Sequence, residues 1–270
     1  MAATGDDLSG TRRGPKAIAA FILIGALAGF LSGLFGVGGG TIIVPLLVLL
    51  LAFPQRFASG TSSAAIIATA VVGLISYAVN DQVDWAAGLI IAAGAIVGAQ
   101  VGVRILHALS EPALRWIFIG FLAIVIVSLF IVVPTRDVEL QLSVLSIIGL
   151  VVLGFVTGVM SGLIGVGGGV VVVPVLMLLF GMGGLIAKGT SLLMMIPTNI
   201  SGTVANFRRK NVDLVAAACV GVAGCALAPF GAWVARLVDP KVGNILFALY
   251  LIVIGAQMAQ KALKARRKAA

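Results

Sequence analysis

Three long stretches without a charged residue, 17–35, 57–80 and 85–103, set the strongest limit on what this chain can fold into. At ~1.5 Å per residue, a helix of any of these lengths reaches across most or all of the ~30 Å hydrocarbon layer of a membrane. The composition agrees, because 61% of the 270 residues are apolar and only 10% are charged, against roughly a quarter in soluble proteins. The sequence therefore predicts an all-α polytopic membrane protein.

The chain also contains an internal repeat with a spacing of 129 residues. Between Gly29 and Ser62, 18 of 34 positions are identical to the residue 129 positions later. The centre of the repeat reads SGLFGVGGGTIIVP at 32–45 and SGLIGVGGGVVVVP at 161–174. The match continues without a gap to Val83-Asp84, which corresponds to Val212-Asp213. These identities indicate a duplication that covers both halves of the chain.

Each half contains an apolar segment, a glycine-rich break, a short apolar segment and three longer spans. As a helix, the short segment 41–53 reaches only ~20 Å, so we expect it to fold back as a hairpin with the segment before it. Each half then crosses the membrane a net three times, and an odd number turns the second half over. The predicted fold is two inverted-topology repeats, each a broken-helix hairpin plus three transmembrane helices. The predicted boundaries are an N-terminal tail (1–16), repeat 1 (17–134), an inter-repeat loop (135–140), repeat 2 (141–262) and a basic C-terminal tail (263–270).

The distribution of basic residues supports this topology. Lys and Arg concentrate on the cytoplasmic side of membrane proteins. With the N-terminus inside, fourteen of the 18 basic residues fall inside, including those of both termini. The two corresponding loops also differ as inversion requires, since residues 80–82 read NDQ and residues 208–210 read RRK. We therefore expect both termini to be cytoplasmic.

The glycines fall into two classes. Those at four-residue spacing, such as Gly25, Gly29 and Gly33 or Gly94, Gly98 and Gly102, are typical of close helix packing in membranes. The adjacent glycines of GVGGG instead weaken a helix by ~1 kcal/mol each relative to alanine, and they predict unwound backbone. Unwound backbone at membrane depth must be buried in protein or line a wet cavity.

Two such breaks favour an anion site. The helices that begin near Thr41 and Val170 would direct their N-terminal amides at the breaks, and glycine lets an anion approach the backbone. We expect alanine at Gly39 or Gly168 to fold normally and bind poorly. A purely architectural hairpin tip is the alternative.

Other polar candidates follow the repeat. AxGTS occurs at 58–62 and 187–191, where a helix start would let the hydroxyls cap amides or meet substrate. Pro197 should interrupt a span and leave Thr198 and Asn199 available for substrate or gating. Lys188 is a single cation matched by Ser59 in the first half. The full predicted substrate site is Gly38, Gly39, Gly40, Thr41, Gly167, Gly168, Gly169, Val170, Thr61, Ser62, Thr190, Ser191, Lys188, Thr198 and Asn199.

The remaining polar residues have structural interpretations. Asp84 and Asp213 should cap matching helices. His107 is expected at the surface, and Cys219 and Cys225 are interpreted as packing residues rather than metal ligands. We expect no catalytic residues, no metal and no cofactor.

Other function classes are disfavoured by the same residues. A GxGxxG nucleotide loop would need glycine where Thr41 stands. Ser32 and Ser161 have no nearby acid or base to make them nucleophiles, which disfavours an enzyme. The basic residues responsible for the net charge of +9 lie between the apolar spans and at the termini. This distribution is typical of membrane topology rather than of nucleic acid binding.

The duplicated SGLxGVGGGxxxVP, the GTS motifs and PTNISGTVANFRR at 197–209 resemble the sulfite exporter TauE/SafE family, also called the toluene sulfonate uptake permeases. The resemblance spans nearly the whole chain. It implies a transporter of small sulfur-containing anions, such as sulfite, sulfonate, sulfoacetate or thiosulfate, in a bacterial cytoplasmic (inner) membrane. The expected partners are this anion and membrane lipid, with no nucleic acid; a homodimer is one oligomeric state left open.

The expected activity is export by alternating access. Each negative charge that moves outward gains ~2.3 kcal/mol in an inside-negative potential of about 100 mV, so an exporter needs no coupling ion. Two alternatives stay open, an importer of organosulfonate or thiosulfate coupled to an ion, and a nontransporting membrane scaffold.

The first testable prediction concerns the inverted topology. Single cysteines at Asn80 and Arg209, in a chain lacking Cys219 and Cys225, should react with a membrane-impermeant maleimide from opposite sides of sealed cells. The Asn80→Cys variant should be labelled from outside, and the Arg209→Cys variant only after the cells are opened. Equal labelling of both from one side would contradict inversion.

Overall fold

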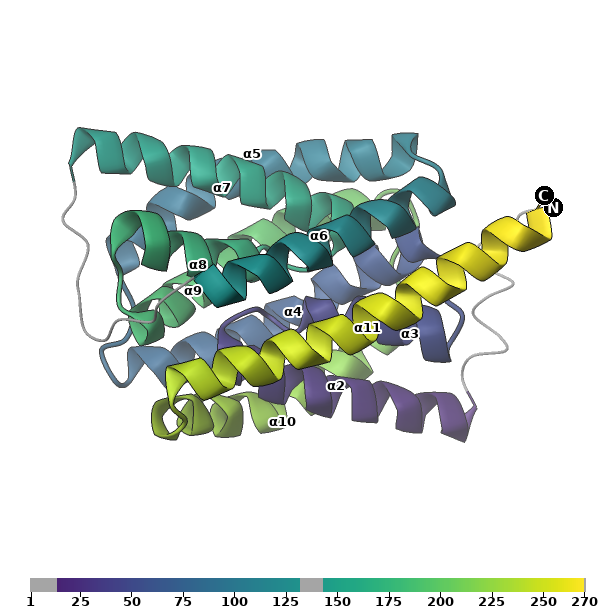
Figure 1. The fold of residues 1–270 in the computed structure, drawn as a ribbon, viewed down its shortest axis with the longest axis horizontal. Coiled ribbons are helices and arrows are strands. Elements are labelled where there is room, and N and C mark those ends of the chain that lie inside the picture. The colour runs from purple at the N-terminus through teal and green to yellow at the C-terminus, as the bar shows by residue number, and fades with distance from the viewer. Residues whose placement is uncertain (1–13, 132–142, 270) are drawn as a thin grey trace.

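A computed structural model of the chain describes residues 14–131 and 143–269, and every regular element in these ranges is an α-helix. Figure 1 shows them as one bundle of helices. In chain order the helices are α2 (Pro15–Phe35), α3 (Gly40–Leu50), α4 (Gln55–Ala78), α5 (Trp85–Ala108), α6 (Glu111–Ile131), α7 (Val144–Ile164), α8 (Gly169–Phe180), α9 (Gly184–Phe207), α10 (Leu214–Leu237) and α11 (Pro240–Ala269).

The helices confirm the predicted fold class of an all-α polytopic membrane protein. Five of those described, α2, α4, α5, α7 and α10, are long and apolar enough to cross a membrane. The short segments are also confirmed, because α3 and α8 contain only 11 and 12 residues. Helix α11 continues to Ala269, so residues 263–269 of the predicted C-terminal tail are helical. The predicted loop 135–140 and most of the predicted N-terminal tail lie outside the described residues.

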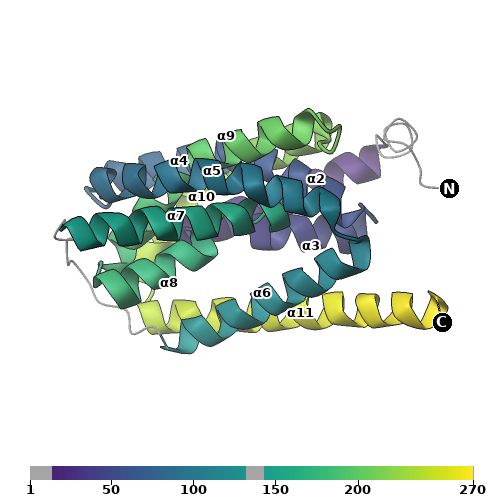
Figure 2. The ribbon, with the colours of Figure 1, turned by 90° about the horizontal axis from the view of Figure 1, so that it is seen from above.

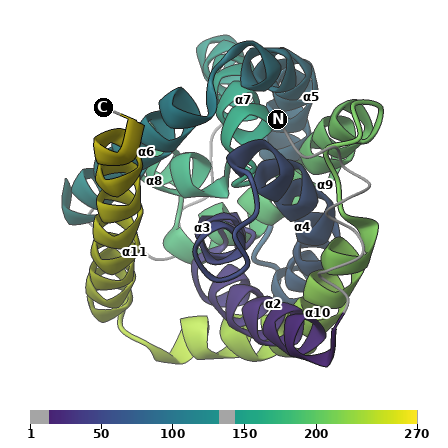
Figure 3. The same cartoon turned by 90° about the vertical axis from the view of Figure 1, so that its right-hand side faces the viewer.

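The two halves of the chain pack on each other reciprocally. Helix α2 packs along α10, and its counterpart α7 packs along α5, so the first helix of each half contacts the fourth helix of the other. The corresponding helices α4 and α9 contact each other. In Figure 1, α2 runs from right to left and α7 from left to right. The fifth helices, α6 and α11, contact each other and lie together at one side of the bundle (Figure 2, Figure 3).

Glycines at four-residue spacing form the two longest helix contacts. A Cβ atom built on Gly25, Gly29 or Gly33 of α2 would clash with backbone carbonyls of α10. Likewise, a Cβ on Gly98 of α5 would clash with the carbonyl of Phe155 in α7. The predicted packing role of these glycines is therefore confirmed. The missing side chains allow the backbones to touch, as small residues do in membrane helices.

The second prediction tests this close contact. Gly98→Ala should destabilise the detergent-solubilised protein by about 1–3 kcal/mol, because the new methyl group has no room beside Phe155. The readout is the melting temperature.

The matched control is Gly202→Ala. Gly202 lies in α9 with no atom within 4 Å of its Cβ position, so alanine there should leave the melting temperature unchanged or raise it slightly. If both variants melt at the same temperature, the glycine contacts between α5 and α7 do not carry the stability assigned to them.

Candidate functional site

Each half of the chain is broken where the sequence predicts it. Helix α2 ends at Phe35 and α3 begins at Gly40, while α7 ends at Ile164 and α8 begins at Gly169. The glycines between them adopt left-handed backbone conformations, with φ of 68–76° in the first break (36–39) and 76–87° in the second (165–168). Other residues rarely tolerate this conformation. The predicted unwound segments and the helix starts beside Thr41 and Val170 are confirmed.

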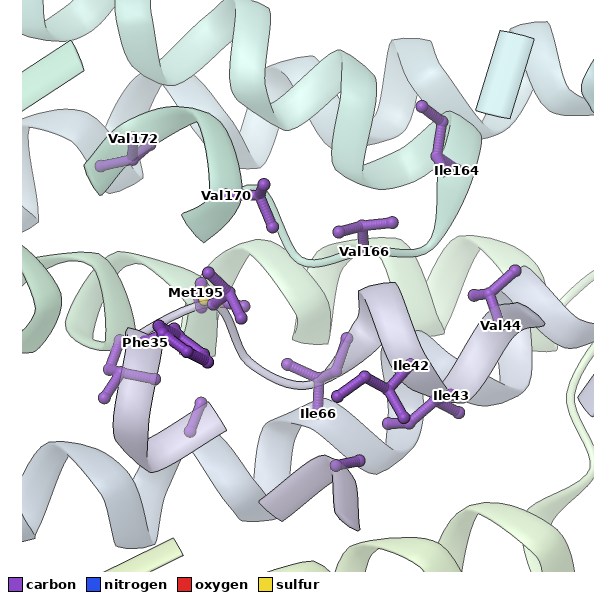
Figure 4. Close-up of a cluster of buried hydrophobic side chains, with 14 of the residues drawn as sticks. Phe35, Ile42, Ile43, Val44, Ile66, Ile164, Val166, Val170, Val172 and Met195 are labelled. Atoms are coloured by element: carbon purple, nitrogen blue, oxygen red, sulfur yellow. The ribbon is translucent and has the colours of Figure 1, made fainter. Parts of the chain in front are cut away.

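The two breaks lie directly against each other at the centre of the bundle (Figure 4). A Cβ atom on Gly40 would lie 2.6 Å from the Cα of Val166, and a Cβ on Gly169 would lie 2.6 Å from the carbonyl oxygen of Gly36. The contact is reciprocal, because each half presents the same glycine to the other half. The helix N-termini of α3 and α8 therefore meet in one buried region.

The expectation that alanine folds normally at Gly39 or Gly168 is wrong. Both glycines have positive φ values, of 76° and 85°. A Cβ on Gly39 would also lie 2.7 Å from the carbonyl oxygen of Ala28. Alanine at these positions strains the backbone, so loss of transport there would not distinguish binding from folding.

The GTS motifs join the two halves. Ser62 donates a hydrogen bond to the carbonyl of Gly165 (2.7 Å), and Ser191 donates one to the carbonyl of Gly36 (2.6 Å). Thr61 and Thr190 accept hydrogen bonds across the halves, from the backbone amides of Asp213 (3.0 Å) and Asp84 (2.9 Å) respectively. Each motif thus fixes both the break and a helix start of the other repeat.

The predicted position of these motifs at helix starts is wrong. Helix α4 begins at Gln55 and α9 at Gly184, so both GTS motifs lie more than one turn inside their helices. The hydroxyls reach other elements instead of capping their own helix. The spacing of residues within each motif could not predict these hydrogen bonds, because the acceptor carbonyls lie more than 100 residues away in the sequence.

The breaks have an excess of hydrogen-bond donors. The carbonyls of Gly36 and Gly165 are occupied by serine hydroxyls. By contrast, the backbone amides of residues 37–41 and 166–170 find no acceptor in normal geometry among the described residues, although all of these residues are buried. The Thr41 hydroxyl is likewise fully buried without a partner. Buried donors normally find an acceptor, so this region is suited to a group rich in acceptor oxygens.

Helix α9 passes beside the breaks and supplies Thr198 and Asn199. The helix is continuous through Pro197, so the predicted interruption is wrong. Thr198 donates to the carbonyl of Met194 (2.7 Å), and the Nδ2 of Asn199 donates to the carbonyl of Met195 (2.8 Å). That nitrogen lies 3.3 Å from the Cβ position of Gly167. Asn199 therefore lies at the second break, and its buried Oδ1 atom has no partner.

Lys188 lies at the first break. Its Cα and Cβ lie 2.7 Å from the Cβ position of Gly36, and the residue is half-buried. The corresponding Ser59 packs in the same way on Gly165 and donates to the carbonyl of Ile164 (2.9 Å). The duplication thus places a cation at one break and a hydroxyl at the other.

The capping prediction holds for both aspartates. The Asp84 carboxylate accepts a hydrogen bond from the amide of Ala87 (2.9 Å), and Asp213 accepts from Val215 and Ala216 (both 3.0 Å). His107 is half-buried in the last turn of α5, where its ring contacts the side chain of Asn211 (3.1 Å).

Two residues at the breaks escaped the sequence interpretation. Met195 and Ile66 correspond in the repeat, and both contact Gly38 and Gly167. Figure 4 shows them among the buried apolar side chains around the breaks. The repeat register contained a signal, because residues one turn before Thr69 and Thr198 should face the same centre. Their apolar character made them look like ordinary core residues.

Comparison with known proteins agrees with this architecture. The profile of the family described as "Sulfite exporter TauE/SafE" matches residues 3–129 and 150–270. YunE of Bacillus subtilis, named a probable membrane transporter protein, is 26% identical over 261 residues, which cover 88% of this chain and 95% of the relative.

Two further relatives have the same description. A probable membrane transporter protein of Xylella fastidiosa strain 9a5c is 31% identical over 192 residues (70% of this chain, 74% of the relative). MJ0441 of Methanocaldococcus jannaschii is 28% identical over 164 residues (57% and 60%). No solved structure matches the chain significantly. The names of these relatives suggest a protein that is not an enzyme. The family match shows that this chain belongs to the sulfite exporter TauE/SafE family of membrane transporters.

Proposed function

We propose that this chain is a secondary transporter that exports a small sulfur-containing anion across the bacterial inner membrane by alternating access between two inverted repeats. The observation that carries the proposal is the donor excess at the two breaks. Ten buried backbone amides, those of residues 37–41 and 166–170, lack acceptors among the described residues, and the carbonyls of Gly36 and Gly165 accept hydrogen bonds from serine hydroxyls instead.

A sulfur oxyanion suits this arrangement chemically. Sulfite and sulfonate groups each carry three oxygens with several lone pairs, so one anion can accept hydrogen bonds from amides of both breaks. The N-termini of α3 and α8 add partial positive charge. Lys188 adds a full charge near the first break. The family description, which names sulfite, supports a sulfur anion over other anions of similar shape.

Alternating access is supported by the reciprocal contacts of the two halves. Helices α2 and α7 correspond in the repeat, run in opposite directions in Figure 1, and each pack on the other half of the chain. Inverted repeats of this kind let one half rock against the other around a fixed central site. The charge distribution supports cytoplasmic termini.

Export is favoured over import by the chemistry of the core. The buried polar side chains of the described residues are hydroxyls and amides, whereas proton-coupled transporters use buried carboxylates or histidines. An inside-negative potential drives an anion outward without a coupling ion, by ~2.3 kcal/mol per charge for each 100 mV. An importer remains the second candidate function and would require a proton or sodium gradient.

The test is anion efflux from proteoliposomes. Vesicles loaded with sulfite, thiosulfate, sulfoacetate, taurine or sulfate are given an inside-negative potassium diffusion potential. We expect one or more sulfur anions to leave faster than from protein-free vesicles, and the rate to rise with the potential. Uptake that appears only with a proton or sodium gradient would support the importer. No flux of any anion would favour a nontransporting scaffold.

Lys188 gives a residue-level prediction. Lys188→Gln should raise the half-saturating anion concentration about 2–5-fold at low ionic strength, because an accessible ion contact contributes up to ~1 kcal/mol. The difference should shrink in high salt. Lys210→Gln is the control, since Lys210 lies exposed in the loop between α9 and α10. An unchanged half-saturating concentration at low salt for Lys188→Gln would remove this residue from the site.

A further inference from the structure

The side chain of Met195 lies where the two breaks meet. Its methyl carbon would clash with the Cβ of an alanine at Gly38 or at Gly167. Its sulfur lies 2.9 Å from the Cβ position of Gly169. One side chain from α9 therefore contacts both breaks and the start of α8. The two glycines are needed at these positions partly because Met195 occupies the space beside them.

The corresponding residue of the first half, Ile66, lies at the same centre. Its methyl groups lie 3.0 Å and 3.4 Å from the Cβ positions of Gly38 and Gly167. The two side chains differ in flexibility. Isoleucine is β-branched and restricted at χ1, whereas methionine is unbranched and changes shape readily. Of the two, Met195 is the side chain that can withdraw without movement of its helix.

Met195 lies against the backbone of the breaks, whose amides an apolar side chain cannot satisfy. The donor-rich breaks lie on both sides of it, and the unpaired hydroxyl of Thr41 lies at the start of α3. The Nδ2 atom of Asn199 lies at Gly167 and already donates to the carbonyl of Met195, whereas the buried Oδ1 atom of Asn199 has no partner. An unpaired buried polar group costs about 1–3 kcal/mol. A methionine methyl held against these donors is therefore expected to be replaced by a better ligand during the working cycle.

We propose that Met195 occupies the position of the transported anion in this conformation, that it must withdraw before the anion binds, and that its size sets an upper limit on the anion. This inference rests on the proposed function and adds to it a specificity-determining residue. The structure corresponds to an occluded state in which the site is closed by the protein itself. Shortening the side chain should then admit sulfonates with larger substituents.

The experiment compares Met195→Ala with Met194→Ala in proteoliposomes. Met194 is a matched control, because it is the adjacent residue, is equally buried in α9, and has its methyl group near Gly168 of the second break only, whereas Met195 contacts both breaks. The measured quantity is the ratio of initial rates for an aryl sulfonate and for sulfite. We expect Met195→Ala to raise this ratio roughly tenfold or more, the usual effect of methylene-sized changes in a pocket. Met194→Ala should leave it unchanged.

The ratio separates selectivity from a general loss of folding, which lowers both rates together. If the ratio does not change in Met195→Ala, or if it changes equally in Met194→Ala, Met195 does not limit the size of the anion.

A second measurement does not depend on flux and serves if Met195→Ala fails to fold. Met195→Cys and Met194→Cys are made in a chain carrying Cys219→Ser and Cys225→Ser and are treated with an anionic methanethiosulfonate reagent. Cysteine at 195 should react, and the transported anion should slow that reaction; cysteine at 194 should show no protection. Protection at neither position, in a chain whose wild type transports the anion, would overturn the inference. Protection at 195 without any wild-type flux would overturn the transport proposal while leaving the anion site in place.

Discussion

Everything at the centre of this protein depends on two backbone segments that touch. The glycine breaks can lie against each other only because their glycines lack side chains. They keep their unwound form because serine hydroxyls from the opposite half donate hydrogen bonds to their carbonyls. A helix would have satisfied its own amides internally. Ser62 and Ser191 bind the carbonyls from outside, and the backbone amides of the breaks stay without acceptors among the described residues.

The long glycine contacts of α2 with α10 and of α7 with α5 have a related consequence. Each ties the first helix of one half to the fourth helix of the other, so neither half holds its own break by itself. Each break follows a helix, α2 or α7, that packs mainly against a helix of the opposite half. The first break therefore lies on the packed pair α2–α10 and the second on the pair α5–α7, so a movement of one pair against the other would shift the two breaks relative to each other.

Much of this architecture could be predicted from the sequence, and the failures have a common cause. Apolar length predicts the spans, and the repeat of GVGGG predicts the breaks, because both signals are local. The GTS motifs were misplaced as helix starts, since their hydroxyls serve partners more than 100 residues away. The sequence predicts that alanine at Gly39 folds normally and only binds poorly, whereas the carbonyl of Ala28 lies against this position in the fold. Met195 was missed because an apolar residue in an apolar helix gives no local signal, and only the contact with both breaks makes it special.

The places where the two halves differ are as informative as the places where they match. Thr41, Lys188, Met195 and Asn199 correspond to Val170, Ser59, Ile66 and Ala70, and all four pairs lie at or beside the breaks. Ile66 and Met195 both lie against Gly38 and Gly167. They have similar volumes but differ in shape, because isoleucine is β-branched and methionine is unbranched and flexible. The same divergence puts a lysine at the first break and a serine at the second, so the two breaks have different electrostatic environments.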